Sequence, residues 1–312
     1  MIPPILRDAV IFASLLTMLS TGLTLTYMTT KVPNFAHGTF AVFGSYITLT
    51  FVSLLKLNPY LSIVPSFLLG GGIALALYLL ILRPLIDRGA SYLVLMIATI
   101  AYDMILYALV NIYADYLNRT FKILTRLFIL KSYDVKIGGQ PGLFIVAPLA
   151  AILMILSMYL LLTKTKFGVA MRAAIENPPL AGVVGINVKL VYAVSWFIAG
   201  ALAGIAGSLI PLWLLSNPDL GARLIVSIFA ASIVGGLTNI YGAALGGVLT
   251  GLAEVLGTGY LSIEVGTWVT PYRPIIPLTM MVITLLLAPK GLSGISWSTL
   301  FRRGELRSGA TD

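Results

Sequence analysis

Few side chains of this chain have the types and spacing that covalent or metal chemistry needs. The sequence holds one histidine and no cysteine, which leaves no thiolate site and no site built on two imidazoles of one chain. Two acids, Asp103 and Glu254, lie inside long apolar runs, each alone on its run, and no H-E-x-x-H or D-x-x-x-D pattern occurs. An intramembrane enzyme needs paired carboxylates, a Ser/His pair or a metal cluster. The sequence therefore predicts neither an enzyme nor a metal site.

The two interior acids need an explanation, because a charge at mid-bilayer costs roughly 2.5–3.5 kcal/mol on insertion scales. Each must face protein, water or a partner, or stay protonated. Asp103, which follows Tyr102, is expected to form a hydrogen bond within a helix bundle. A second interpretation makes Asp103, Glu254 and His37 the working groups of an ion- or proton-coupled secondary transporter, and it stays open as the alternative function.

The scarcity of charge indicates a membrane protein. Of 312 residues, 59% are hydrophobic and 10% are charged, against roughly 25% charged residues in a soluble domain, and the mean hydropathy is +1.00. A soluble enzyme, a nucleic-acid binder and a disordered chain are excluded. The net charge of +9 comes from Lys and Arg between apolar runs, a pattern of membrane sidedness. We expect contact with membrane lipid and none with nucleic acid.

The elements that carry these residues are nine apolar runs. They lie at residues 9–28, 36–55, 61–82, 91–112, 143–162, 190–212, 224–237, 242–260 and 275–288. A crossing needs about 20 residues; the seventh and ninth runs are short, so one of them is a candidate for a re-entrant or tilted segment. Strand-like alternation is missing, and helices satisfy their own backbone in lipid. We predict an all-α integral membrane protein, a polytopic bundle of eight or nine transmembrane helices in one domain, residues 1–312.

Small residues recur four positions apart on two of these runs. The pairs are Gly200 with Gly204, Ala203 with Gly207, Gly242 with Gly246, and Gly247 with Gly251. This spacing puts small residues on one helix face and lets helix backbones approach closely. The pairs therefore predict sites of helix–helix packing.

Lys and Arg give the orientation. The loops near Lys31 and Arg83, residues 163–189 and the tail 290–312 together hold slightly more than half of the basic residues, and long loops count less in the positive-inside rule. We expect a multi-pass protein of the plasma (inner) membrane with the N-terminus outside and the C-terminus in the cytoplasm. Residues 163–189 and 290–312 are then cytoplasmic, and residues 113–140 form an extracytoplasmic loop.

The loop at residues 113–140 interleaves apolar with basic side chains. Its apolar members include Phe121, Leu124 and Phe128, and its basic members include Lys122 and Arg126. Such a pattern is typical of a helix lying on the membrane surface. A docking surface for an external partner fits it as well, and the sequence leaves both interpretations open.

Residues 163–189 contain signals for a short isolated helix. Asn177 is a good N-cap, Pro178 suits the first helical position, and Gly185 can take the left-handed conformation that ends a helix. The residues between them are largely apolar, and so short a helix does not stabilise itself in water. It must dock onto the rest of this protein or onto a separate soluble subunit. No G-x-x-x-x-G-K-[ST] motif occurs, so any nucleotide energy must come from another polypeptide.

At this loop the sequence resembles the permeases of ABC importers for branched-chain amino acids, in particular their H-type subunit. The matching positions are Arg172, Ala173, Glu176, Asn177, Ala181, Gly185 and Ile186. Further matches follow in order at residues 34–38, 44–46, 83–85, 98–100, 234–251 and 289–294, which together cover nearly the whole chain. The chain departs from the family pattern at residues 29–31, Ala101, residues 238–239 and Ser293.

The resemblance implies a heteromeric complex. It would contain this chain, a second related permease subunit, two ABC ATPase subunits and an extracytoplasmic solute-binding protein, and it would take up leucine, isoleucine, valine or a related amino-acid substrate by alternating access. This chain would hold no cofactor, because the partner subunits would bind ATP. Residues 172–186, with Pro178 opening the short helix, would couple the spans to the ATPases.

Two stretches look like interrupted helices, the kind of break that lines a pathway in transporters. Residues 33–38 open the second run, and residues 238–242 join the seventh and eighth, with an asparagine near an aromatic residue in both. The candidate pathway residues are Asn34, Phe35, His37, Gly38 and Asn239. The alternative is a pair of ordinary turns at the membrane surface.

Overall fold

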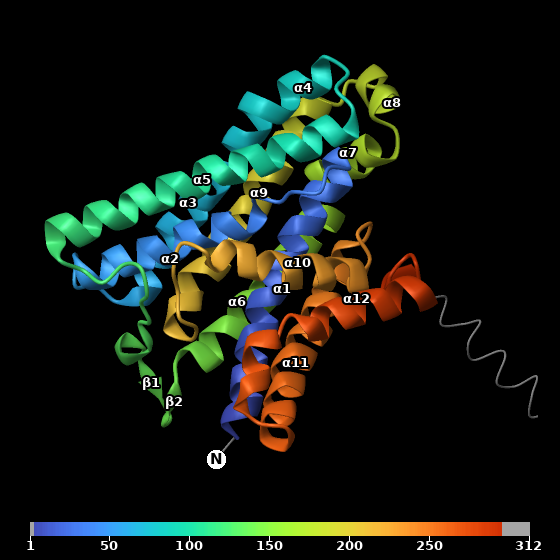
Figure 1. The fold of residues 1–312 in the computed structure, drawn as a ribbon. Helices are drawn as coiled ribbons and strands as arrows, with labels where there is room; N and C mark the ends of the chain where they lie inside the picture. Colours follow the sequence, from blue (N-terminus) through green and yellow to red (C-terminus); the bar gives the residue numbers. More distant parts are fainter. Residues whose placement is uncertain (1–2, 295–312) are drawn as a thin grey trace, which may run out of the picture.

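The computed structural model describes residues 3–294 as a helical bundle (Figure 1). The helices are α1 (Pro4–Thr30), α2 (His37–Ser53), α3 (Ile63–Ala76), α4 (Arg83–Asp87), α5 (Tyr92–Phe121), α6 (Leu143–Lys164), α7 (Lys166–Glu176), α8 (Pro178–Val183), α9 (Val188–Leu209), α10 (Leu220–Gly235), α11 (Ile240–Glu264) and α12 (Ile275–Leu287). A π-helical segment, Leu77–Leu82, joins α3 to α4. Short 3-10 turns lie at Pro59–Ser62, Lys131–Tyr133, Ile210–Leu212, Thr267–Tyr272 and Leu292–Gly294, and strands β1 (Lys136–Ile137) and β2 (Gln140–Pro141) form a small antiparallel hairpin.

Seven helical segments of the described residues are long and apolar enough to cross a membrane. They are Pro4–Thr30, Pro59–Asp87, Tyr92–Phe121, Leu143–Lys164, Val188–Leu212, Ile240–Glu264 and Ile275–Gly294, and α10 is a shorter apolar helix. The predicted all-α polytopic fold is therefore confirmed. α2 has 17 residues and α10 has 16, which at 1.5 Å per residue gives about 25 Å, less than the roughly 30 Å of hydrocarbon.

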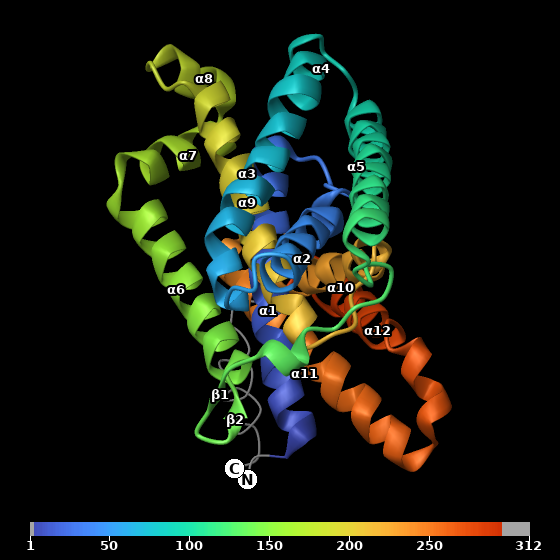
Figure 2. The same ribbon diagram turned by 90° about the vertical axis from the view of Figure 1, so that its left-hand side faces the viewer.

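The centre of the bundle is formed by α1 and α9. The apolar windows of these spans are 94% and 78% buried, whereas those of the α5 and α12 spans are 22% and 11% buried. Figure 2 shows α5 and α6 on opposite sides of the central helices. The peripheral helices therefore leave wide apolar faces for lipid or for other membrane chains.

The small-residue pairs lie at the closest helix contacts of this core. A Cβ added to Gly204 would lie 2.0 Å from the Ser66 carbonyl oxygen, and one on Gly207 would lie 1.9 Å from the Ala41 carbonyl oxygen. On α11, a Cβ on Gly251 would lie 2.5 Å from the α1 backbone at Ala13. Each distance is far below a van der Waals contact, so only glycine allows these backbone approaches. The predicted packing role of the small-residue pairs is confirmed.

The expected surface helix at residues 113–140 is wrong. α5 continues to Phe121 and ends where Lys122 takes the left-handed conformation, and the chain then follows an irregular path without a helix longer than one turn. Two of its apolar side chains pack inward: Phe128 and Leu130 are 5% and 4% exposed, and Phe128 exchanges backbone hydrogen bonds with Ser216 at 3.0 and 2.8 Å. Phe121, Leu124 and Leu127 stay exposed. The Tyr46 hydroxyl donates to the Thr125 carbonyl at 2.8 Å. The stretch is therefore an irregular segment anchored to the bundle at Thr125 and Phe128.

The loops fall into two groups at opposite ends of the bundle (Figure 1). Lys31, Arg83, Pro178 and Lys189 line one cavity at the end that carries α4, α7 and α8. The other end carries the β-hairpin and the start of α1, where Ile5 would meet a Cβ on Gly259 near the end of α11. The loops near Lys31 and Arg83 and residues 163–189 thus share one end, as the basic-residue count requires. The part of the predicted 290–312 tail from residue 295 onward lies outside the described residues.

Candidate functional site

The predicted short helix exists as α8, with both of its end signals in place. The Asn177 side-chain oxygen accepts a hydrogen bond from the Leu180 N–H at 3.1 Å, and Pro178 is the first helical residue. Gly185 has φ of +86°, and the Ile186 N–H donates to the Ala181 carbonyl at 2.9 Å. An N-cap and a left-handed glycine therefore fix a helix of 6 residues that its own length would not stabilise.

The outer face of α8 is apolar and exposed. Ala181 is 2% exposed and faces the protein, whereas Leu180, Val183 and Val184 are 58%, 84% and 68% exposed. Glu176 and Asn177 beside them are exposed as well. An exposed apolar cluster on a loop that lies outside the bundle is typical of a contact surface for another protein. The structure thus shows one face of α8 docked on this chain and the other without a partner among the described residues.

α8 lies between α7 and α9, which are hydrogen-bonded to each other. The Tyr192 hydroxyl of α9 donates to the Ala174 carbonyl of α7 at 3.1 Å, and Ala174 is fully buried. The Arg172 guanidinium donates to the carbonyl of Leu162 at the end of α6. Ala173 and Ile186, the remaining predicted coupling residues, are half-buried at the two ends of this segment. α7, which directly precedes α8, is thus hydrogen-bonded to both α9 and the end of α6.

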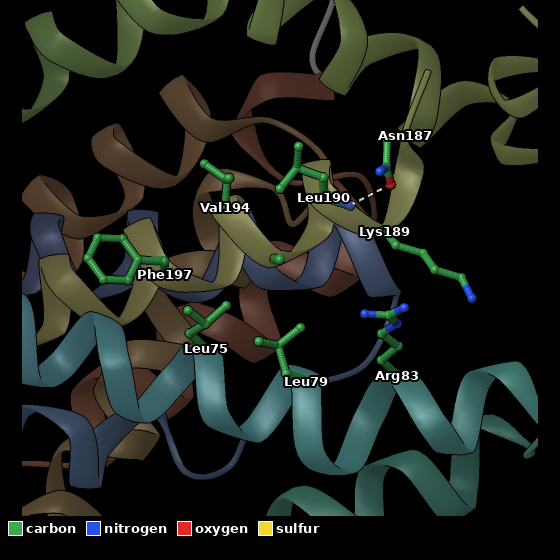
Figure 3. Close-up of a pocket in the computed structure, with 9 residues that line it drawn as sticks. Leu75, Leu79, Arg83, Asn187, Lys189, Leu190, Val194 and Phe197 are labelled. Atoms are coloured by element: carbon green, nitrogen blue, oxygen red, sulfur yellow. Dashed lines mark hydrogen bonds between the residues drawn. The ribbon is translucent and has the colours of Figure 1, made fainter. Parts of the chain in front are cut away.

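A groove of about 490 Å³ separates the base of α9 from the α3–α4 segment. Figure 3 shows Leu75 and Leu79 on one wall, facing the α9 side chains, with Arg83 and Lys189 at one end of the groove. Lys189 Nζ also lies 2.7 Å from an Asp87 carboxylate oxygen, which links α9 to the end of α4. An exposed ion pair thus adds to the packing of α9 on α3 beside a largely apolar groove.

The first predicted helix break lies deep in the bundle. His37 is fully buried, and its Nε2 lies 3.0 Å from the carbonyl oxygen of Leu19 in the middle of α1. Because Leu19 is about 16 Å from the Thr30 end of α1 at 1.5 Å per residue, residues 31–36 carry the chain back into the interior before α2 begins. Asn34 is fully buried too, and its side-chain oxygen accepts from the Ala36 N–H at 3.2 Å. The alternative of a turn at the membrane surface is therefore wrong for residues 33–38.

Two buried nitrogens near this break have no hydrogen-bond partner within residues 3–294: Asn34 Nδ2 and His37 Nδ1. The Phe35 ring contacts the Phe229 ring of α10 at a tilted angle of 43°, with ring centroids 5.2 Å apart. Buried polar groups usually find a partner, and each exception calls for an explanation. The break therefore combines unused hydrogen-bonding capacity with an aromatic contact between α2 and α10.

The N-terminal ends of α2 and α10 meet in the interior. A Cβ on Gly38 would lie 2.3 Å from the Gly221 carbonyl oxygen, so two glycines allow the contact. The Thr39 hydroxyl next to it donates to the Asp103 carboxylate at 2.5 Å. One turn further along α5, the Tyr107 hydroxyl donates to Asp219 at the start of α10 at 2.8 Å. The Asp103 carboxylate therefore lies beside the first turn of α2, and Asp219 directly precedes α10. The predicted hydrogen bond of Asp103 within the bundle is confirmed.

Asn239 does not join this group. Its side-chain oxygen accepts from the N–H groups of Tyr241 and Gly242 at 3.0 and 3.2 Å, so it caps α11. Gly221 and Asn239 lie at opposite ends of α10, and Asn239 shares a cavity of about 430 Å³ with Arg172. Residues 238–242 therefore lie away from the first break, and the segment that reaches it is the start of α10, which follows residues 213–219. The sequence did not indicate this contact, because Pro218 and Asp219 are typical of an ordinary loop between two apolar runs. A pathway role of Asn239 stays a prediction.

Glu254 has a charged partner that the sequence reasoning missed. Arg273 Nε donates to the Glu254 carboxylate at 2.6 Å, and Glu254 is 3% exposed. The guanidinium of Arg273 lies over the Phe12 ring, 4.2 Å from its centroid. The sequence did contain a signal for this ion pair: Arg273 is a lone cation between two apolar runs. Both interior acids therefore have at least one partner within the fold.

These features define a multi-pass α-helical membrane protein with helices interrupted in its interior, an architecture typical of transporters. A family model described as the permease component of branched-chain amino acid transport systems matches residues 5–285. The chain is 45% identical to a probable branched-chain amino acid transport permease protein LivH of Methanocaldococcus jannaschii, over 96% of this chain and 94% of that protein. It is 25% identical to the high-affinity LivH permease of Escherichia coli K12 (92% and 94% covered) and to the BraD permease of Pseudomonas aeruginosa (89% and 91% covered).

The chain therefore belongs to the branched-chain amino acid transport permease family. No solved structure matches it. The relatives are named as transport permeases, which confirms the expected non-enzymatic role. The alternative of an ion-coupled secondary transporter finds no support in the family or in the partnered acids.

Proposed function

We propose that this chain is one of two permease subunits in an ATP-driven importer of leucine, isoleucine, valine or a related amino acid. Its partners are a second related permease, two ABC ATPase subunits that bind the ATP, and an extracytoplasmic solute-binding protein. The observation that carries the proposal is the exposed apolar face of α8, a helix held between the hydrogen-bonded helices α7 and α9. The relatives named as branched-chain amino acid permeases support the substrate class.

The end that carries α8 faces the cytoplasm in this proposal. Lys31, Arg83 and Lys189 gather there, which agrees with the positive-inside rule. The start of α1 lies at the other end, so the N-terminus is outside. The β-hairpin and the irregular stretch after α5 then form an outer surface on which the solute-binding protein docks.

Coupling follows from the way α8 is held. When ATP closes the ATPase dimer, a cleft on the ATPase moves α8, and the Tyr192–Ala174 hydrogen bond and the Arg172–Leu162 contact pass the movement to α9 and α6. ATP shifts the permease between states only as far as it binds them differently. Residues 172–186 thus act as a lever and perform no covalent chemistry.

The interior junction of α2 and α10 is the proposed path for substrate. Asn34, His37 and Asp103 lie around it, and the first two keep unpaired nitrogens. Gly38 permits the approach of α10, and Phe35 contacts that helix. A small shift of one helix N-terminus past the other would open or close the passage.

Copurification tests the proposal. The tagged chain, extracted in mild detergent from its own host, should bring down a soluble subunit with a P-loop motif and a second permease of the same family. Recovery of the chain alone, active in ion-driven uptake, contradicts the proposal and restores the secondary-transporter interpretation.

A further inference from the structure

A partly open cavity lies between α1, α10, α11 and the Thr267–Tyr272 turn. Its volume is about 320 Å³, and its walls include Phe12 of α1, Leu220 and Leu224 of α10, and Glu254 of α11. The residues that connect Thr267–Tyr272 to α12, Arg273 and Pro274, close one side. The cavity is at the end of the bundle opposite to α8, so it lies in the outer half in the orientation proposed above. Its size suits a ligand of few atoms.

The cavity contains an ion pair whose hydrogen-bonding capacity is only half used. Glu254 Oε1 accepts from Arg273 Nε at 2.6 Å. The other carboxylate oxygen, Glu254 Oε2, and the Arg273 Nη2 group are buried and have no partner among the described residues. Burial of unpaired charged atoms is costly. One acceptor and one donor of opposite charge therefore stay unused on two residues that line the cavity.

A second guanidinium gives the site a charge preference. Arg223 also lines the cavity, and its Nη2 donates to Asn217 at 2.5 Å. With Arg223, Arg273 and Glu254 the wall has one more positive than negative charge. A carboxylate is therefore favoured near the guanidinium groups, while an ammonium group is favoured only at Glu254.

The remaining walls are apolar. Phe12, Leu214, Leu220 and Leu224 surround the ion pair. Arg273 also lies over the rings of Phe12 and Trp213, at 4.2 and 5.4 Å from their centroids, which holds the guanidinium in one place. A ligand that matches this wall carries a carboxylate, an ammonium group and a short aliphatic side chain on one carbon atom.

We propose that this cavity is a binding site for an aliphatic α-amino acid within the permease itself. The substrate carboxylate binds Arg273 Nη2, the substrate ammonium group binds Glu254 Oε2, and the side chain contacts Phe12 and the leucines. The inference rests on the proposed function for its choice of ligand, and it adds a recognition step inside the membrane chain. An external binding protein would then not be the sole source of selectivity.

Equilibrium binding of radiolabelled L-leucine to the copurified complex in nanodiscs, without the solute-binding protein, tests the site. Two competitors each lack one charge: 4-methylpentanoate has no amino group, and 3-methylbutylamine has no carboxylate. We expect each to compete at least tenfold more weakly than unlabelled L-leucine. We expect E254Q to weaken leucine binding at least tenfold while competition by 4-methylpentanoate stays the same.

Because E254Q removes a structural ion pair, a second variant fills the cavity and leaves the pair intact. Leu215 lines the cavity and is 41% exposed, so Leu215→Trp should block binding without changing the melting temperature. Asp115→Asn, which removes the exposed pair with Arg126 at 2.7 Å, is the matched control and should bind as wild type.

The outcomes separate this inference from the proposed function. Undetectable leucine binding by the wild-type complex, equal competition by either single-charge analogue, or wild-type binding in both E254Q and L215W overturns the site. If the same preparation still imports leucine with ATP and the binding protein, the proposed function stands. If it imports no amino acid under any condition, the proposed function fails by itself.

Discussion

The substitution Val183→Asp isolates the contact that the account assigns to α8. Val183 is 84% exposed in the single chain, so its replacement leaves the fold intact and should change the free energy of unfolding by less than about 0.5 kcal/mol. In the complex the same side chain is expected to be buried against the ATPase. The variant therefore affects the assembled complex and leaves the isolated permease as it was.

The size of the effect follows from burial. A valine side chain that is fully buried contributes about 1.5–3 kcal/mol, and every 1.4 kcal/mol is tenfold in affinity. Loss of this contact weakens ATPase association by a factor of about 10 to 150, and the buried carboxylate adds a further desolvation cost. We expect uptake to fall in parallel when the ATPase is limiting.

The assay is a titration of purified ATPase subunits against the immobilised permease, with uptake measured on the same preparations. Ile137→Asp is the control, because Ile137 is 46% exposed in β1 at the opposite end of the bundle. The control should bind the ATPase as wild type does; it serves the titration alone, because the β-hairpin belongs to the proposed docking surface of the solute-binding protein. Equal affinity of the Val183 variant and wild type, with uptake preserved, would refute the assignment of α8.

Two further changes test the packing and the helix end. Gly207→Leu should lower the melting temperature in detergent, since even a Cβ would lie 1.9 Å from the Ala41 carbonyl oxygen and overpacking costs about 1–3 kcal/mol of stability. The control is Gly182→Ala, whose added Cβ meets nothing within 4 Å and which should leave the melting temperature unchanged. An unchanged melting temperature of the Gly207 variant would show that α2 and α9 are not in contact there. Gly185→Val should destabilise the end of α8 by about 1–2 kcal/mol, because φ is +86° there. It should speed amide exchange in α8 and reduce coupled uptake, and Gly185→Asn should have a milder effect. Identical exchange in both variants would contradict the left-handed helix end.

Local signals predicted the elements that have local causes. α8 could be placed within a residue because Asn177 and Gly185 fix its ends through their own backbone chemistry. The close helix contacts were predictable because a spacing of four puts small residues on one face of a helix. Such features need no knowledge of the rest of the fold.

Features that depend on distant partners were missed. The apolar residues near Phe128 suggested a surface helix, because nothing in that stretch shows that Ser216 and Tyr46 cover it. The interior break before α10 and the Glu254–Arg273 pair likewise join segments far apart in sequence. The hydrophobic pattern of the sequence indicates which residues must be buried. Only the tertiary fold determines which other residues bury them.

The most direct test of the central claim is uptake of labelled leucine into liposomes that hold the copurified complex, with the solute-binding protein outside. Uptake should require ATP at the α8 side and should persist after ionophores remove proton and sodium gradients. Uptake that proceeds without ATP and stops with the ionophores would contradict the account.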